Sequence, residues 1–327
     1  MIFPRTMLTM AFFSLLISLD ANEGFSGTIY YKWLYPTDST AGEFNNFSFD
    51  RIYLKYEKAW GPDIKINLTT DVAAPTQGEG WHAYQKFAYL EYSSAVGQFL
   101  IGLQGMNIFN VAEKTWGYRF LAKASMHDRK FSNSADMGLG YVNTFGENLH
   151  LHLTLTNGIG YKHVENDQYK KMAVQVVYGP KNLSQSKGFN AGFVGSFEPY
   201  TYQGADTLTE SRTVIALFGG LATPALRVGA EFDVLTDSGM DLTKWLMALY
   251  VEHRIPVLPD LKMKVFGRVE YYEPDLDLEP DRETDLIFGL NFSPAKAFKV
   301  APNLRYHLPE GGTGSITAYQ LNFEFKY

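Results

Sequence analysis

Residues that catalyse reactions or bind metals are few in this chain, and their spacing forms no recognisable catalytic site. There are seven histidines and no cysteine, which excludes thiolate catalysis, disulfides and cysteine-based zinc sites. A His-Asp pair at 127–128 lies near Ser132 and Ser134, the one neighbourhood with the ingredients of a hydrolase. His150 and His152 would share one face of a strand, but no third metal ligand is near. We therefore predict no catalytic residues, metal or cofactor.

Charge gives a clearer indication of function in segment 105–133. Its basic side chains outnumber its two carboxylates; they are Lys114, Arg119, Lys123, His127, Arg129 and Lys130. If this segment folds into a channel as a constriction loop, its positive field favours anions. If it is an exposed loop, the same charges are merely solvated, and both interpretations are open. Trp116, Phe120 and Leu121 need a surface to pack on, which favours the inward-folded loop.

The segments on either side of this loop alternate between hydrophobic and polar residues, as β-strands do. The chain ends in AYQLNFEFKY, in which every second residue from Tyr319 to Tyr327 is aromatic or leucine. No stretch outside the N-terminal region shows a long helical period, although 111–126 could hold a short helix. The alternation predicts sixteen strands, at 24–34, 44–58, 62–74, 83–93, 97–104, 134–145, 147–157, 171–180, 187–198, 210–219, 224–235, 243–254, 260–272, 283–293, 297–307 and 315–327.

The links between these strands alternate in length. Links after even-numbered strands are short, such as 93–97 and 293–297, whereas links after odd-numbered strands are long and polar, such as 158–170, 199–209 and 273–282. The link 179–187 is an exception, because it is long where a short link is expected. Alternating short turns and long loops around an even number of strands are typical of an outer-membrane barrel. We predict an all-β fold, a 16-stranded antiparallel transmembrane β-barrel with a long loop after strand 5 folded inward.

A barrel of this width cannot be filled by its own side chains, so its polar face lines water and its apolar face meets lipid. The predicted pore-lining basic residues are Arg51, Lys55, Lys65, Arg227, Lys262, Lys264, Arg268, Lys299 and Arg305. Inward-facing acids are predicted as well, at Asp71, Glu91, Glu231, Asp233, Glu270, Asp285 and Glu324. This mixed wall is compatible with a mild anion preference and equally with an almost unselective pore.

Both ends of the chain fit this interpretation. Residues 1–21 combine Arg5 with a short apolar run and are predicted to be a signal peptide, which leaves 22–327 as the barrel. Backbone groups in lipid must all be paired, so the last strand is expected to pair with the first. The net charge of -6 argues against binding of nucleic acid.

Several segments resemble the phosphate-selective porin O and P family. They are FDRIYLKYEKAWGPDIKINLTTD (49–71), FAYLEY (87–92), GQFLIGLQGMNIFNVAEKTWGYR (97–119) and SADMGLGY (134–141). The resemblance covers about residues 44–145 and the terminal strand. It implies a passive channel, usually trimeric, in the outer membrane of a Gram-negative bacterium, with a C-terminal strand read by the barrel-assembly machinery. No arginine ladder can be matched residue by residue, so phosphate selectivity is not implied.

The sequence therefore predicts a porin that lets small hydrophilic solutes or ions diffuse across the bacterial outer membrane, with either a mild anion preference or almost no selectivity. Its other partners would be outer-membrane lipid and further copies of the chain in a homotrimer. Two alternatives are an outer-membrane β-barrel enzyme and a specific substrate transporter. The first lacks an identifiable Ser-His arrangement, and the second would need an N-terminal hatch, for which little chain precedes the first strand.

Overall fold

Antiparallel strands form most of the part of the chain that the computed structural model describes, namely residues 24–37, 45–73, 81–203, 207–257, 259–310 and 314–327. The sixteen strands in these ranges are β1 (Phe25–Pro36), β2 (Asn46–Trp60), β3 (Ile64–Ala73), β4 (His82–Ser94), β5 (Gly97–Gly105), β6 (Ala135–Phe145), β7 (Leu149–Thr156), β8 (Lys171–Tyr178), β9 (Gly188–Gln203), β10 (Thr207–Ala222), β11 (Leu226–Asp237), β12 (Leu242–Arg254), β13 (Lys264–Glu273), β14 (Glu283–Ala295), β15 (Phe298–Pro309) and β16 (Ile316–Lys326). The predicted signal peptide lies outside the described residues. None of the described helices is long and apolar enough to cross a bilayer.

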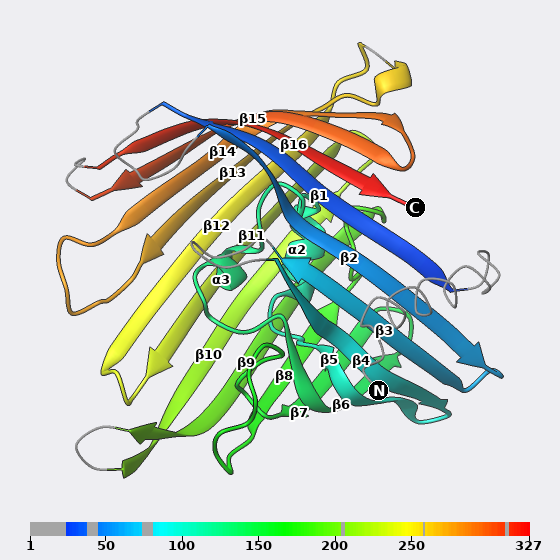
Figure 1. Ribbon diagram of the computed structural model, residues 1–327, viewed down its shortest axis with the longest axis vertical. Coiled ribbons are helices and arrows are strands. Elements are labelled where there is room, and N and C mark those ends of the chain that lie inside the picture. The colour runs from blue at the N-terminus through cyan, green and yellow to red at the C-terminus, as the bar shows by residue number, and fades with distance from the viewer. Residues whose placement is uncertain (1–23, 38–44, 74–80, 204–206, 258, 311–313) are drawn as a thin grey trace, which may run out of the picture.

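The sheet closes on itself because β1 pairs with β16, while every other strand pairs with its neighbours in sequence (Figure 1). The closing register places Tyr31 opposite Phe323. At the end of this seam, Gly27 and Tyr327 exchange backbone hydrogen bonds of 3.1 and 3.2 Å. A Cβ atom at residue 27 would lie only 2.2 Å from the Tyr327 ring, so the glycine makes room for that ring. The predicted closed antiparallel barrel is confirmed.

The strands turn their apolar side chains outward and their charged side chains inward. In β11, Arg227, Glu231 and Asp233 are only 6%, 4% and 0% exposed, whereas Phe232 between them is 45% exposed. A soluble protein would show the reverse. The same exposure of large hydrophobic side chains recurs around the barrel, at Leu54, Leu68, Ile101, Leu139, Leu153, Met172, Phe193, Ile215, Leu249, Phe288 and Tyr319. This apolar belt is built to lie in the hydrocarbon of a bilayer.

Two links differ from the sequence prediction. The predicted long link 199–209 is mostly strand, because β9 and β10 stay paired out to Gln203 and Thr207. The predicted strand 260–272 starts late, since a 3-10 helix, η2 (Pro259–Leu261), occupies its beginning and β13 starts at Lys264. The left-handed backbone conformation at residue 262 interrupts the extended backbone that a strand requires. Lys262 consequently lies outside the strand, exposed and with φ of 45°.

The link between β5 and β6, residues 106–134, lies inside the barrel, so the predicted inward-folded loop is confirmed (Figure 1). The loop contains two short helices, α2 (Asn110–Trp116) and α3 (Ser125–Asp128), and α2 agrees with the short helix expected within 111–126. Gly117 ends α2 in a left-handed conformation, φ 74°, and its N–H binds the carbonyl of Glu113. Helix α2 lies against β10 and β11, and α3 against β12.

Hydrophobic side chains hold this loop against one side of the inner wall. One cluster joins Ile108, Phe109, Val111, Met126 and Phe131 of the loop to Val194, Val214, Leu235 and Leu246 of the wall. A second cluster joins Trp116, Tyr118, Phe120 and Leu121 to Tyr250, Phe266 and Ile287. The loop side chains that needed a packing surface thus find it on strands β12 to β15 and on Tyr30 of β1.

The exceptional link 179–187 reaches the same loop from the opposite end of the barrel. Leu183 is 2% exposed, and the Ser184 N–H donates to the Lys114 carbonyl at 3.2 Å. The approach is close, because a Cβ atom at Gly117 would lie 2.7 Å from the Cβ of Ser184. One half of the interior is therefore filled from both ends.

A lysine on the apolar belt tests the inside-out arrangement. We expect Leu249→Lys to lower the free energy of unfolding by about 2–4 kcal/mol, because the ammonium group would face hydrocarbon near the middle of β12. Thr28→Lys, which faces an internal cavity, should leave stability almost unchanged. Urea unfolding of both variants in lipid vesicles measures the difference. Equal costs for the two lysines would contradict the assignment of faces.

Candidate functional site in the barrel interior

Three inward arginines on the wall bind the backbone of the inner loop. Each donates to a loop carbonyl: Arg227 to Trp116 (2.9 Å), Arg268 to Lys123 (2.8 Å) and Arg305 to Leu121 (2.6 Å). Arg227 and Arg268 are 6% and 7% exposed. The loop covers them, so they fix its position instead of facing an open lumen. This corrects the expectation of a freely accessible basic wall at these strands.

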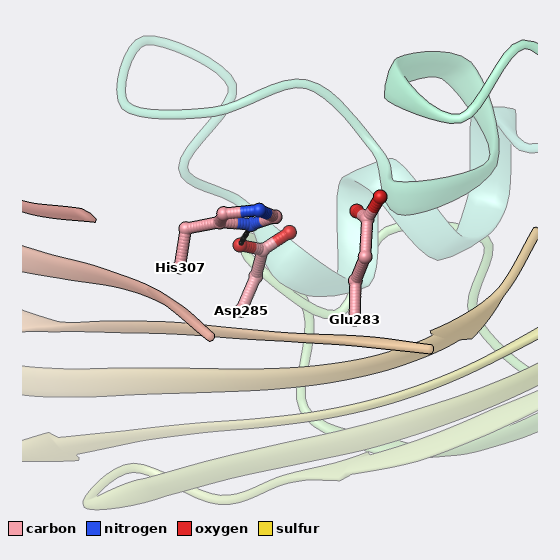
Figure 2. Close-up of side chains that lie close together, drawn as sticks. All are labelled: Glu283, Asp285 and His307. Carbon is pink, nitrogen blue, oxygen red and sulfur yellow. Dashed lines mark hydrogen bonds and ion pairs between the residues drawn. The ribbon is translucent and has the colours of Figure 1, made fainter. Parts of the chain in front are cut away.

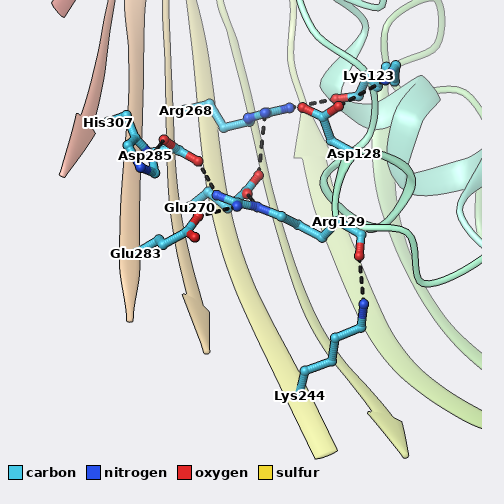
Figure 3. A network of polar contacts seen from close by, with 9 residues as sticks. All are labelled: Lys123, Asp128, Arg129, Lys244, Arg268, Glu270, Glu283, Asp285 and His307. Carbon is cyan, nitrogen blue, oxygen red and sulfur yellow. Dashed lines mark hydrogen bonds and ion pairs between the residues drawn. The ribbon is translucent and has the colours of Figure 1, made fainter. Parts of the chain in front are cut away.

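Arg129 anchors the loop from its own side. Its Nε donates to Glu270 at 2.6 Å, and its two terminal nitrogens bind Glu283 and Asp285 (Figure 3). The guanidinium also lies over the Tyr272 ring, 4.3 Å from the centroid. Charge-assisted contacts of this kind are the strongest hydrogen bonds in proteins. The loop is therefore held to β13 and β14 through one side chain.

Two of these carboxylates also belong to a cluster with metal-ligand chemistry. Glu283, Asp285 and His307 bring one ligand atom each to within 4.8 Å of one another, the only such group in the described residues (Figure 2). His307 Nδ1 lies 2.8 Å from Asp285. Because Arg129 already supplies the positive charge that these carboxylates need, the cluster works as a loop anchor.

Two large cavities lined by described residues lie inside the barrel. The turn-side cavity, about 580 Å³, lies between β1–β4 and the inner loop. The loop-side cavity, about 560 Å³, lies among the inner loop, the link 157–170 and the wall from β8 to β12. His127 and Ser134 line both cavities, so the two compartments adjoin at this level. These two residues mark the boundary through which any solute would pass.

Positive charge dominates both cavities although the whole chain is acidic. The turn-side cavity has four cationic side chains (Lys55, Lys86, Lys114, Arg119) and two carboxylates (Glu57, Glu113). The loop-side cavity has seven cationic side chains (Arg51, Lys123, Lys130, Lys162, Lys171, Arg212, Lys244) and three carboxylates (Asp128, Glu198, Asp237). A concave wall with a surplus of one charge concentrates ions of the opposite sign.

Two β-bulges add inward charges to the wall that faces the inner loop. The register between β1 and β2 skips Asp50, so Asp50 contacts Arg119 at 3.4 Å while its neighbour Arg51 also points inward to Asp71. The register between β3 and β4 skips Lys86, so Lys86 and Phe87 both line the turn-side cavity. A bulge redirects a side chain without lengthening the barrel, and bulges are frequent next to functional sites.

The link 157–170 forms a polar bridge across the loop-side mouth. The Tyr161 hydroxyl donates to Asp71 on β3 at 2.9 Å, and Arg51 binds the same carboxylate at 3.1 Å. Next to this bridge, the Lys162 ammonium lies 4.7 Å from the centroid of the Tyr84 ring. No carboxylate of the described residues forms an ion pair with Lys162. Its charge is therefore available to the cavity.

His127 stays uncharged despite its place among the cavity walls. Its ring stacks on Phe109 at 5.0 Å, and its Nδ1 has no hydrogen-bond partner among the described residues. It lies on α3, outside the strands that cross the bilayer. Burial lowers the pKa of His127 to about 3, and repulsion from Arg119, Lys123 and Lys86 acts in the same direction. The positive field comes from the lysines and arginines, not from this ring.

The other predicted site residues have varied surroundings. Lys55 and Lys65 both pair with Glu57, at 2.7 and 3.0 Å, at the turn-side end. Lys123 pairs with Asp128 at 3.1 Å, and Lys114 and Lys130 line the cavities without an ion pair among the described residues. Lys264 binds Glu252 at 2.8 Å and Lys299 binds Glu324 at 2.6 Å.

Sequence reasoning missed Lys86 and Lys162. Strict alternation from Tyr89 would place Lys86 on the lipid face, and only the break at the Lys86-Phe87 step signals a bulge. Lys162 lies in a link whose path across the mouth depends on the contact between Tyr161 and Asp71. The sequence did hold one sign of this bulge. Lys86 falls among the alternate residues that should face lipid, where a charged side chain is costly.

Loss of the Arg129 anchor should loosen the inner loop. We expect Arg129→Gln to lower the free energy of unfolding by about 3–5 kcal/mol, since three carboxylates would lose their common partner. Lys326→Gln is the control: its ion pair is half exposed and Glu324 keeps Lys299, so the cost should stay below about 1 kcal/mol. Chemical unfolding and limited proteolysis within 106–134 report both effects. Unchanged stability and protection in Arg129→Gln would contradict the anchor.

The ring of His127 should remain neutral where an ordinary histidine gains a proton. Its pKa is lowered, so between about pH 7 and pH 5 the ring gains no charge, and protonation begins only towards pH 3. Histidine NMR titration of the folded barrel measures this, with His127→Asn identifying the signal. A midpoint near pH 6.5 for that signal would contradict the buried environment.

No family model and no curated protein sequence matches this chain. Solved structures match along almost its whole length. The OprB structure of Pseudomonas putida has a TM-score of 0.70 at 10% identity and covers 98% of this chain and 97% of that chain. An anion-selective porin from Comamonas acidovorans has a TM-score of 0.68 at 12% identity, covering 93% and 98%. OmpT of Vibrio cholerae in its trimer form has a TM-score of 0.65 at 11% identity, also covering 93% and 98%.

Identities this low show the fold alone. The chain is a closed, sixteen-stranded β-barrel of the porin type, the architecture with which bacterial outer-membrane proteins cross the bilayer.

Proposed function

We propose that this chain is a passive diffusion channel of the bacterial outer membrane for small hydrophilic solutes, with a preference for anions. The observation that carries the proposal is the combination of an apolar exterior with two adjoining internal cavities, both lined by more cations than carboxylates. The outside of the barrel is suited to hydrocarbon and the inside to water. Transport of solutes through the interior is the function that fits both. No catalytic arrangement is needed for this function.

The route runs along the wall formed by β1 to β4. The inner loop fills the other side of the interior. The arginines of that wall donate hydrogen bonds to the backbone carbonyls of the loop. A solute would pass from the loop-side cavity, beside Arg51 and Lys162, to the turn-side cavity, beside Lys86 and Arg119. His127 and Ser134 lie at the junction. Along this route the unpaired positive charges are those of lysines, which bind anions as compact point charges.

Two similarities support finer parts of the proposal. The Comamonas acidovorans porin of similar fold is described as anion-selective, which agrees with the charge of the cavities here. OmpT of Vibrio cholerae occurs in a trimer form, which supports a homotrimer for this chain. Outer-membrane lipid around the belt, and recognition of β16 by the barrel-assembly machinery, complete the proposed partners. The phosphate selectivity of the porin O and P family is not part of the proposal, because no arginine ladder can be matched in this sequence.

Ion selectivity tests the proposed function directly. In a planar bilayer with a potassium chloride gradient, we expect the reversal potential to have the sign of chloride selectivity. Lys86→Gln combined with Lys162→Gln should lower the chloride-to-potassium permeability ratio by a factor of about two to five, because two charges near the route are removed. Lys296→Gln, in the exposed turn between β14 and β15, is the matched control and should change nothing.

Two results would overturn parts of the proposal separately. A protein that folds and inserts but conducts no current would contradict the channel. A current with a reversal potential of the potassium sign would contradict the anion preference and leave the channel standing.

A further inference from the structure

The turn-side cavity is lined by more aromatic rings than an ion pathway requires. Its rings are Tyr30, Tyr53, Phe87, Tyr89 and Phe109. Hydroxyls or amides would serve a small hydrated anion better than ring faces, which offer it few hydrogen bonds. The cavity volume of about 580 Å³ also lies within the range of about 300–1,000 Å³ that is usual for small-molecule sites.

Lys86 is the centre of this aromatic wall. Its Nζ lies 4.6 Å from the centroid of the Tyr53 ring and 5.8 Å from that of Phe87, and it donates to the Tyr53 hydroxyl at 3.2 Å. No carboxylate of the described residues forms an ion pair with it. The bulge on β4 turns Lys86 and Phe87 inward together, and the Phe87 ring stands edge-on to Tyr89 at 6.3 Å. A cation and two rings are thus presented side by side.

Arg119 supplies a second cation from the inner loop. Its guanidinium lies over the Tyr30 ring, 5.7 Å from the centroid, and its Nη2 has no hydrogen-bond partner among the described residues. Asp50 and Glu113 lie at 3.4 and 3.6 Å, which are long for charge-assisted bonds. Arg119 is therefore held in place by two long ion pairs, and its unpartnered Nη2 is buried.

We propose that the turn-side cavity is a binding site for aromatic carboxylates, which it holds briefly as they cross. The carboxylate lies between Lys86 and Arg119, and the ring packs against Phe87 and Tyr89. The inference rests on the proposed channel function, because the site lies on the proposed route. It differs from a simple anion preference in one respect: it requires a flat, unsaturated ring as well as a negative charge. No bond is made or broken, so the site slows and selects its solute without chemistry.

Current blockade by matched acids tests this site. Benzoate is compared with cyclohexanecarboxylate, which has the same charge and a saturated ring, and with acetate and inorganic phosphate. We expect benzoate to reduce the open-channel current at concentrations about fivefold lower than cyclohexanecarboxylate, because aromatic packing adds to the shared charge interaction. Acetate and phosphate should block less than either. Equal blockade by benzoate and cyclohexanecarboxylate, or stronger blockade by phosphate, would overturn the proposal.

Two variants separate the contributions of charge and ring. Lys86→Gln should raise the half-blocking concentration of benzoate and of cyclohexanecarboxylate alike, by about tenfold, because a charge-assisted contact is lost. Phe87→Leu keeps an apolar side chain and should weaken benzoate alone. Lys296→Gln should affect neither acid. If Phe87→Leu changed both acids equally, or neither, the ring would not be bound where we place it.

A binding measurement keeps this inference separate from the channel proposal. Saturation-transfer NMR of benzoate with the detergent-solubilised barrel needs no conduction, and Lys86→Gln should raise the dissociation constant measured from the signal by about tenfold. Binding without any current would retain the site and contradict the channel. Current without preferential binding of benzoate over cyclohexanecarboxylate would retain the channel and contradict the site.

Discussion

Each backbone N–H and C=O group at bilayer depth must find its partner within the protein, because hydrocarbon offers none. The pairing of β1 with β16 meets this requirement and leaves the sheet without an edge. Closure has a second consequence. A sheet of sixteen strands encloses more space than inward side chains can fill. The inner loop and the link 179–187 occupy part of that space, and the two cavities lie beside the inner loop.

A loop inside a barrel has backbone groups that pair with no strand. Charged side chains of the wall form hydrogen bonds with these groups. Arg227, Arg268 and Arg305 donate to loop carbonyls, so their charge is committed to structure. Arg129 makes the opposite arrangement: here the cation belongs to the loop, and carboxylates of the wall bind it. Both arrangements lie on the strands from β11 to β15. On the opposite wall, β1 to β4, Lys55 and Lys65 pair with Glu57, whereas Lys86 binds the Tyr53 hydroxyl and has no ion pair among the described residues.

The period-2 pattern and the alternating link lengths predicted the fold well, because lipid penalises any strand whose alternation fails. All sixteen predicted strands start within four residues of the observed ones, and the late start of β13 is the largest difference. The site was predicted less well. The inward orientation of Arg268 follows from the alternation of side chains along the strand. Its burial beneath the Lys123 carbonyl depends on where a distant loop packs. The alternation also predicts the wrong face wherever a bulge inserts a residue, as at Lys86.

The bulges explain how a barrel can change its lumen without changing its outside. Strict alternation gives one inward side chain for every two residues, and any further inward charge would have to replace a lipid-facing residue. An extra residue in β2 or β4 adds an inward side chain without replacing a lipid-facing one. Strand pairing continues on both sides of the extra residue, so the apolar face is uninterrupted. Asp50 then holds Arg119, while Lys86 remains unpaired beside Phe87. Two inserted residues, Asp50 and Lys86, thus add inward charges to the wall that faces the inner loop.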